Sequence, residues 1–326
     1  MQWTNLEPKL DQFCVEHEDT HYSAVCVIDP VTGYMSLHGR HERPFRTAST
    51  NKIAALLEVY KQKDSGAVDL NEQIYVTEED YPSGGSDLYT NGLLPDTFTL
   101  GDLAVRMIRD SDNTATNVVM RRVGRENIRT TLSSLGINPN MVTETSYTGE
   151  DEGAIWVTDH WEYTMEAFNL TQKTTISDMG KLLHSIYRND LLTPQSRNDV
   201  LDIMKMTRDT TRLRGGMPRF VPIAHKAGSL TGGNMVVDGV VQWVDQWEGY
   251  QEAPGISHDA GIVLIDGSEY IVAVFTEGGT GNGSWMVREV SAMVFDAFLG
   301  GRAVRPITAI FGGSDGLYGV GPSVGR

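Results

Sequence analysis

The sequence is short of cysteine, of positive charge and of long apolar runs. No apolar run reaches the roughly 18 residues that a membrane-spanning helix needs. The first residues, MQWTNLEPKLDQF, have neither the basic start nor the unbroken apolar stretch of a secretory signal. The 27 Lys and Arg residues are outnumbered by 43 Asp and Glu, and the net charge of −16 repels phosphate backbones and anionic lipids. We expect a cytoplasmic protein, or a secreted one if a signal was trimmed, with no nucleic-acid or membrane partner.

The two cysteines, Cys14 and Cys26, are too few for a disulfide framework in a chain of 326 residues. We expect two reduced thiols. The alternative is a single bridge between the first helix and the first strand, which requires these segments to lie side by side.

Hydrophobic periodicity divides the chain into a mixed part at both ends and a helical part between them. The mixed part is expected to hold a helix, two early strands, three late strands and a closing helix, at 3–17, 23–29, 33–39, 221–229, 259–266, 270–278 and about 284–299. Helical periodicity is clearest in 52–63, 100–111, 115–123 and 176–188. Because helices and strands do not alternate throughout, a doubly wound sheet is excluded. We predict an α+β fold: an antiparallel sheet flanked by the N- and C-terminal helices, with an inserted all-helical subdomain.

This order makes the chain a single domain. Its α/β part is expected to cover about 1–46 and 215–300, and its helical part about 47–214. The Gly-rich tail 302–326 has little to bury and is expected to be a loosely held extension.

Two acidic, aromatic stretches, 149–169 and 238–257, interrupt this plan. Loops of this length are usually functional or disordered, and their tryptophans argue against disorder. We expect them to roof the functional site and to select a neutral or cationic, partly aromatic substrate through cation–π contacts. An oligomer contact is the alternative.

Ser49 and Lys52 stand three residues apart in TASTNKIAALLEVY, where an apolar helix begins. Residues three apart share a helix face, so the lysine amine can reach the serine hydroxyl. A serine becomes nucleophilic when a base takes its proton, and a lysine becomes such a base when burial or nearby cations lower its pKa. The pattern is typical of a Ser–Lys nucleophile pair. A serine N-cap followed by a solvated lysine is the plain alternative.

Ser111, Asp112 and Asn113 stand between two helical segments. The Ser111 hydroxyl can relay a proton to a leaving amine, and the Asn113 amide can hold both a lysine and a substrate carbonyl. A turn made of capping residues explains the same sequence.

Lys226, Ala227 and Gly228 lie in a strand-like segment that ends at Ser229. The lysine supplies a positive charge, and the small residues let a substrate backbone approach the strand. The N–H of Ser229 can then complete an oxyanion hole with the N–H of Ser49. A solvated lysine on an edge strand is the alternative.

The three motifs occur in the order S-x-x-K, S-D-N and K-x-G, at a helix start, an interhelical turn and a strand. Together with FRTASTNK, SDNTATNVV, AHKAGSL and HDAGIVLIDG, they make the sequence resemble the class A β-lactamase and penicillin-binding superfamily of serine acyl-transferases over about 20–300. The resemblance implies the β-lactamase/transpeptidase fold, with Ser49 as nucleophile and Lys52 as its proton acceptor. It also implies that Ser111 shuttles the proton to the leaving group. Asn113 would orient Lys52 and the substrate amide, and Lys226 would tune Ser111 and attract a carboxylate.

Two departures from the family pattern limit this expectation. Ala227 stands where the family has Thr or Ser, whose hydroxyl helps to hold the β-lactam carboxylate. The family also has a glutamate four places before an asparagine, and the pair holds the water that frees the acyl-enzyme. Here Glu162 and Glu166 precede Asn169 by seven and three places. We favour Glu166 as the base, and a solvated loop carboxylate is the alternative for either.

We therefore expect a serine hydrolase or acyltransferase that acts on a small-molecule amide, lactam or ester, without efficient β-lactam hydrolysis being implied. A penicillin-binding D,D-peptidase or an acylated sensor is the alternative. The remote alternative is a zinc metalloprotease, because His17 to His21 match H-E-x-x-H. Zinc needs both histidines in one stable helix, and His21 is expected beyond the last turn. No metal or cofactor is expected.

Overall fold

A computed structural model describes residues 3–81, 85–142, 172–230, 234–237, 240–243, 255–278 and 283–299. Its centre is a five-stranded sheet of order β2-β1-β11-β10-β7, in which every neighbouring pair is antiparallel. These strands are β1 (Tyr22–Ile28), β2 (Met35–Gly39), β7 (Ile223–Leu230), β10 (Ile256–Val263) and β11 (Tyr270–Glu277). Both ends of the chain contribute strands, so the predicted antiparallel sheet and the α+β fold class are confirmed.

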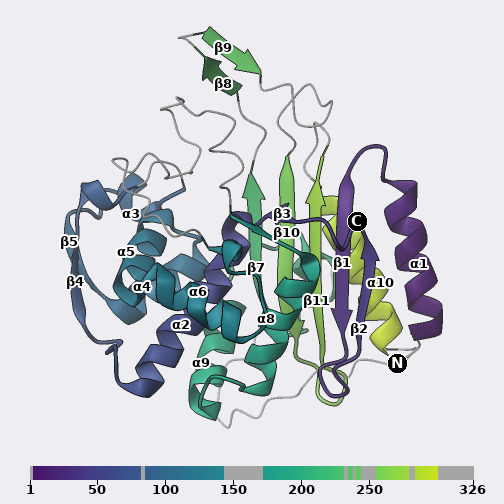
Figure 1. The fold of residues 1–326 in the computed structure, drawn as a ribbon, viewed down its shortest axis with the longest axis horizontal. Coiled ribbons are helices and arrows are strands. Elements are labelled where there is room, and N and C mark those ends of the chain that lie inside the picture. Colours follow the sequence, from purple (N-terminus) through teal and green to yellow (C-terminus); the bar gives the residue numbers. More distant parts are fainter. Residues whose placement is uncertain are drawn as a thin grey trace, which may run out of the picture.

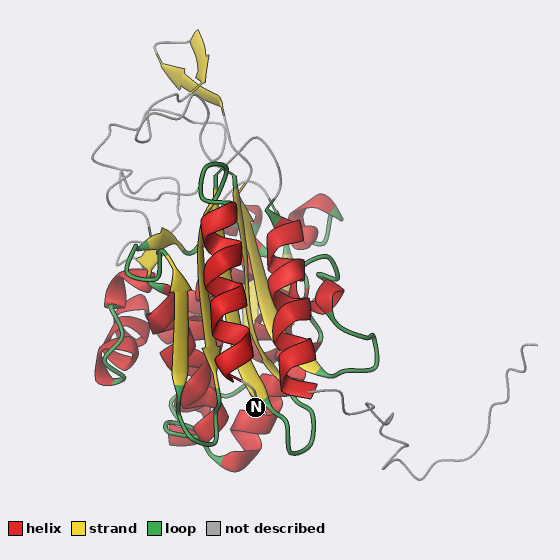
Figure 2. Cartoon of the chain, turned by 90° about the vertical axis from the view of Figure 1, so that its right-hand side faces the viewer, coloured by secondary structure: helices red, strands yellow, loops and turns green. Residues whose placement is uncertain are grey.

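Helices cover both faces of this sheet. On one face lie α1 (Trp3–Glu16) and α10 (Ser284–Leu299), which run side by side along the strands (Figure 2). On the other face lie α8 (Ile176–Arg188) and the inserted helices (Figure 1). Alternate residues of a strand point to opposite faces, so a strand buried on both sides is apolar throughout. Strand β1 follows this rule, with Ala24 in the core toward α8 and Val25 in the core toward α1.

The same alternation decides the state of the two cysteines. Cys14 lies on α1 in one core, whereas Cys26 points from β1 into the other. Both are free, so the expectation of two reduced thiols is confirmed and the bridge is wrong, because the sheet separates the two side chains. Burial raises the pKa of the Cys26 thiol to about 12, which keeps it protonated at neutral pH.

The inserted part is mostly helical. Besides α8, its helices are α2 (Lys52–Ser65), α3 (Asp87–Thr90), α4 (Leu100–Arg109), α5 (Asn113–Val123), α6 (Arg125–Ser134) and α9 (Pro194–Lys205). Short 3₁₀ turns are η1 (Ala48–Asn51), η2 (Glu78–Asp80), η3 (Pro139–Met141) and η4 (Leu213–Gly216). The domain boundaries near 46 and 214 stay predictions.

Within the described ranges, three small strand pairs lie outside the main sheet. They are β3 (Phe45–Arg46) with β6 (Lys173–Thr174), β4 (Gln73–Val76) with β5 (Asp96–Thr99), and β8 (Asn234–Val237) with β9 (Val240–Trp243). None of these pairs was predicted from sequence periodicity, because strands this short carry little alternation. The stretch 149–169 and the tail 302–326 lie outside the described residues, as do 244–254 of the second insertion. Within the described part of the chain, no helix is long and apolar enough to cross a bilayer.

Candidate active site

Ser49 lies in the one-turn helix η1, which leads directly into α2. The residue before it, Ala48, has φ +46°, in the left-handed region that a residue with a Cβ seldom occupies. Such a conformation persists only where the surroundings hold it. Here the Thr47 N–H donates to the Gln172 carbonyl at 2.9 Å, and the Asn51 side chain donates to the Gln172 side chain. The half-buried Ser49 is thus presented by a strained turn fastened on both sides.

The backbone of β7 passes very close to Ser49 at Gly228. A Cβ placed on Gly228 would lie 2.9 Å from the Ser49 nitrogen and 3.1 Å from the Thr50 nitrogen. Only glycine fits there, which explains the glycine of the third motif. The strand then brings Ser229, which is exposed, to the same edge. A role for the N–H groups of Ser49 and Ser229 in an oxyanion hole stays a proposal.

Lys52 is completely buried at the start of α2. Its amine donates to the Ser111 carbonyl and to Asn113 Oδ1, both at 2.7 Å, and to Ser111 Oγ at 3.2 Å. Burial, and then the charge of Lys226, lower the pKa of Lys52 well below the usual value. The plain alternative of a solvated lysine is wrong. The structure brings Lys52 to Ser111 and Asn113, and among the described residues no hydrogen bond joins its amine to the Ser49 hydroxyl.

The three residues of the turn between α4 and α5 have different roles: Asp112 is structural, whereas Ser111 and Asn113 belong to the site. Asp112 caps α5 by accepting from the Ala115 N–H at 2.8 Å, and it also accepts from the Leu88 N–H at 2.9 Å. The capping alternative therefore holds for Asp112. Ser111, whose φ of +56° is again left-handed, and Asn113 face Lys52 instead.

Lys226, in β7, is the second buried amine, with only 2% of its surface exposed. It donates to Ser111 Oγ at 3.0 Å and to the Ala227 carbonyl at 2.7 Å. Burial lowers its pKa to about 8, although the Asp259 carboxylate acts in the opposite direction. A solvated edge-strand lysine is excluded. The Ser111 hydroxyl lies between two amines whose pKa values are both lowered, a suitable place for a proton relay.

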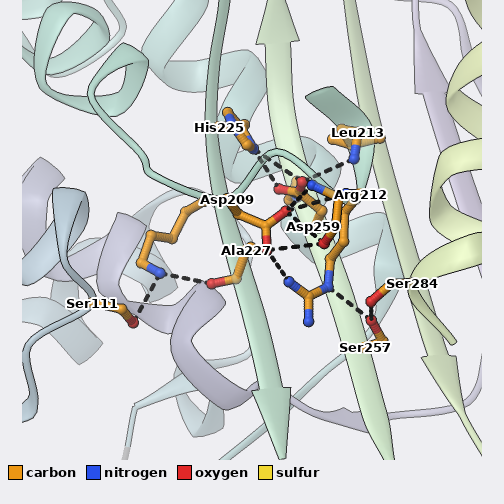
Figure 3. A network of polar contacts seen from close by, with 12 residues as sticks. Ser111, Asp209, Arg212, Leu213, His225, Ala227, Ser257, Asp259 and Ser284 are labelled. Carbon is orange, nitrogen blue, oxygen red and sulfur yellow. Dashed lines mark hydrogen bonds and ion pairs between the residues drawn. The ribbon is translucent and has the colours of Figure 1, made fainter. Parts of the chain in front are cut away.

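A buried polar network behind β7 was not predicted from the sequence. His225 Nδ1 contacts the Asp259 carboxylate at 2.9 Å, and the Leu213 N–H donates to the same group at 3.1 Å. Arg212 forms an ion pair with Asp209 and donates through Nε to Ser257 Oγ at 2.7 Å (Figure 3). The sequence does place polar residues such as His225 and Asp259 within otherwise apolar strands. Which of them contact each other depends on the register between β7 and β10. That register sets Asp259 opposite Ala227.

Two other expected sites have different outcomes. Glu162 and Glu166 lie outside the described residues, so the expectation of a water-activating glutamate stays a prediction. The helix α1 ends at Glu16, so both His17 and His21 lie beyond it and cannot form a helical zinc pair. In the ranges that the structure describes, no three His, Cys, Asp or Glu side chains are grouped to hold a metal ion.

Comparison with known proteins gives a consistent picture. The model of the "Beta-lactamase enzyme family" matches residues 5–298. The chain is 26% identical over 192 residues to beta-lactamase VEB-1 of Pseudomonas aeruginosa, covering 57% of this chain and 59% of that protein. It is 25% identical over 218 residues to a beta-lactamase of Streptomyces cellulosae, covering 66% and 65%. These matches thus span less than two thirds of either relative.

Solved structures show the same fold. PBP-A matches with a TM-score of 0.68 at 23% identity, covering 91% of this chain and 96% of that one. The extended-spectrum beta-lactamase TLA-3 matches with a TM-score of 0.71 at 19% identity, covering 90% and 99%. At these identities, the likeness extends to the fold alone.

Proposed function

The chain belongs to the beta-lactamase enzyme family, and on that premise we propose that it is a serine hydrolase that opens an amide, lactam or ester bond through an acyl-enzyme on Ser49. One observation carries this proposal. The buried amine of Lys52, whose pKa is lowered, shares the Ser111 hydroxyl with the buried amine of Lys226. Two desolvated amines around one hydroxyl serve no packing purpose, and they provide a base and a proton relay beside the presented serine.

Acylation follows from this arrangement. Neutral Lys52 takes the Ser49 proton while Ser49 Oγ forms a bond to the substrate carbonyl carbon. The oxygen of that carbonyl gains negative charge, which the N–H groups of Ser49 and Ser229 and the N-terminus of α2 stabilise. The scissile bond then breaks as Ser111 gives its proton to the leaving group. Ser111 regains a proton from Lys52, 3.2 Å away, which leaves Lys52 neutral.

Two carbonyl oxygens that accept hydrogen bonds from Lys52 orient its amine for proton transfer. The Ser111 carbonyl and Asn113 Oδ1 accept two of the amine's hydrogens at 2.7 Å. A neutral amine has two hydrogens and one lone pair, so these two acceptors can hold both hydrogens and leave the lone pair to accept a proton from a hydroxyl. Asn113 thus orients Lys52 as well as the substrate amide.

Hydrolysis of the ester then requires an activated water, which we assign to Glu166, with Glu162 as the other candidate. A second function, acyl transfer to an amine or stable acylation as in a penicillin-binding protein or sensor, is supported by Ala227 and by the spacing of these glutamates from Asn169. Both departures affect groups that the family uses for rapid β-lactam turnover.

We propose a substrate that lacks an essential carboxylate beside the reacting carbonyl. Ala227 offers no hydroxyl, and the nearby Arg212 guanidinium, 6% exposed, is occupied by Asp209 and Ser257. The acidic, aromatic insertions 149–169 and 238–257 favour a neutral or cationic, partly aromatic molecule in addition.

Intact-mass spectrometry tests this function. The protein and a Ser49→Ala variant are exposed to a fluorophosphonate and to benzylpenicillin, and the adducts are followed with time. We expect a fluorophosphonate adduct in the wild-type protein that the variant lacks. A transient penicillin adduct indicates a hydrolase, and a persistent one indicates a sensor or slow transferase. A folded wild-type protein that forms no adduct with either probe would overturn the proposal.

A further inference from the structure

A buried histidine on β10 contacts the segment that presents Ser49. His258 is fully buried, and the strand register places it opposite Gly228, the residue whose backbone lies against the Ser49 nitrogen. Its ring stacks on Phe275 with centroids 4.3 Å apart and meets the edge of Phe45 at 6.0 Å. The His258 ring is therefore packed between Phe275 of β11 and Phe45 of β3.

Both ring nitrogens of His258 have defined partners. The Thr276 backbone N–H donates to Nδ1 at 3.1 Å, so Nδ1 is an acceptor without a proton. The proton then lies on Nε2, which donates to the Arg46 carbonyl at 2.9 Å. Burial lowers the pKa of His258 to about 3, in agreement with a permanently neutral ring of one tautomer.

The Arg46 carbonyl is the upstream end of the strained turn. Two residues, Thr47 and Ala48, separate Arg46 from Ser49, and Ala48 holds its φ of +46°. A strained backbone relaxes unless it is fastened on both sides. Gln172 fastens Thr47 and Asn51. The Arg46 side chain reaches the main sheet through its ion pair with Glu277 of β11. The bond from His258 ties the backbone carbonyl of Arg46 to β10, the strand that pairs with the one carrying Gly228.

We infer that His258 is a positioning residue for Ser49, which holds the Arg46 carbonyl through Nε2–H so that the nucleophile and its N–H keep their place against Gly228. The inference rests on the proposed role of Ser49 as nucleophile. His258 does not contact Ser49 and exchanges no proton in this role. Its substitution should therefore slow the chemical step of acylation and leave the first, reversible binding of a substrate nearly unchanged.

Two substitutions distinguish the two hydrogen bonds of the His258 ring, because each keeps a different one. In His258→Gln, the amide nitrogen can take the place of Nε2 and donate to the Arg46 carbonyl. In His258→Asn, the amide oxygen can take the place of Nδ1 and accept from Thr276, and the bond to Arg46 is lost. Both variants keep one of the two buried hydrogen bonds, so their losses of stability are expected to be similar. The matched control is His38→Gln, which alters a buried histidine of β2 that contacts Ser36 and Asp11 near α1.

The experiment measures the rate constant of acylation and the dissociation constant for a fluorophosphonate by stopped-flow, together with thermal unfolding. We expect H258N to acylate Ser49 roughly tenfold to a hundredfold more slowly, with H258Q and H38Q within about threefold of the wild-type rate. Equal rates in H258N and H258Q, with both folded, would overturn the inference and show a role in stability only. Absence of acylation in the wild-type protein would instead contradict the proposed function. If H258N does not fold, His258→Thr takes its place, because its short side chain also has no donor that reaches the Arg46 carbonyl. Slow acylation with the wild-type dissociation constant then supports the inference, and the wild-type acylation rate contradicts it.

Discussion

Lys52 Nζ lies 3.2 Å from the hydroxyl of Ser111, although 59 positions separate the two residues in the sequence. Lys226 Nζ approaches the same hydroxyl from β7 at 3.0 Å. This contact joins the start of α2, the α4–α5 turn and the edge of the main sheet at one oxygen atom.

Removal of the Ser111 hydroxyl should lower kcat/KM by an amount that depends on the leaving group of the substrate. An amine must be protonated before it leaves, whereas a nitrophenolate leaves without help. We expect Ser111→Ala to lower kcat/KM for an amide or lactam by roughly 10²- to 10⁴-fold, and for a nitrophenyl ester much less. Steady-state kinetics with a matched amide and ester give the comparison. An equal loss with both substrates would contradict a proton relay through Ser111.

A methyl group on Gly228 should disturb the site directly. Its Cβ would lie 2.9 Å from the Ser49 nitrogen, so one of the two backbones has to move. We expect Gly228→Ala to destabilise the fold by about 1–3 kcal/mol and to slow acylation at least tenfold. Gly267→Ala is the control, because its Cβ would meet no atom within 4 Å and only its φ of +69° is strained. Urea unfolding and acylation rates are measured for both, and wild-type acylation in G228A would be contrary to the close approach.

The burial of Lys226 should appear in the pH dependence of stability. Its pKa falls to about 8 in the folded protein, from 10.5 in an ordinary lysine. Between these pH values the unfolded chain holds a proton that the folded protein has lost, so this group makes stability rise with pH. Below about pH 8 its penalty is fully present. Lys226→Met should remove up to ~1.4 kcal/mol of slope per pH unit in this window, measured by urea unfolding from pH 7 to 10.5. Identical slopes in both proteins would be inconsistent with a lowered pKa.

The Ala227 departure predicts a gain of function. A hydroxyl at this position restores the group with which the family holds a carboxylate. We expect Ala227→Thr to lower KM for a carboxylate-bearing lactam by roughly threefold to tenfold, the value of one hydrogen bond. A neutral ester should be unaffected. No difference between the two substrates would mean that this position does not select for the carboxylate.

The sequence was informative where periodicity or motif order carried the signal. The closing helix was expected at 284–299 and lies at Ser284–Leu299, and the motif residues Ser111, Asn113 and Lys226 gather around Lys52. Their spacing in the sequence does not reveal which partners the amine selects. Among the described residues, the hydrogen bonds of the Lys52 amine go to Ser111 and Asn113, because the α4–α5 turn folds against the start of α2.

Other parts of the site depend on long-range pairing and were not predictable. The contact of His225 with Asp259 depends on the register of β7 and β10. The hydrogen bond from His258 to the Arg46 carbonyl depends on the place of β10 in the sheet and on the β3–β6 pair. A polar residue within an apolar strand indicates that a buried partner exists, but the sequence does not identify it. The short antiparallel pair of β4 and β5 was missed because a run of four residues has too little alternation to detect.

The central claim is that Lys52, neutral because it is buried beside Lys226, activates Ser49. The most direct measurement is the pH dependence of Ser49 acylation by a fluorophosphonate, in the wild-type protein and in Lys52→Gln. Because burial lowers the pKa of Lys52, the wild-type rate should rise with pH to a plateau, with its midpoint well below 10.5. Lys52→Gln should be slower by roughly 10³-fold and should lack this midpoint. A folded Lys52→Gln protein with the wild-type rate and pH profile would contradict the account.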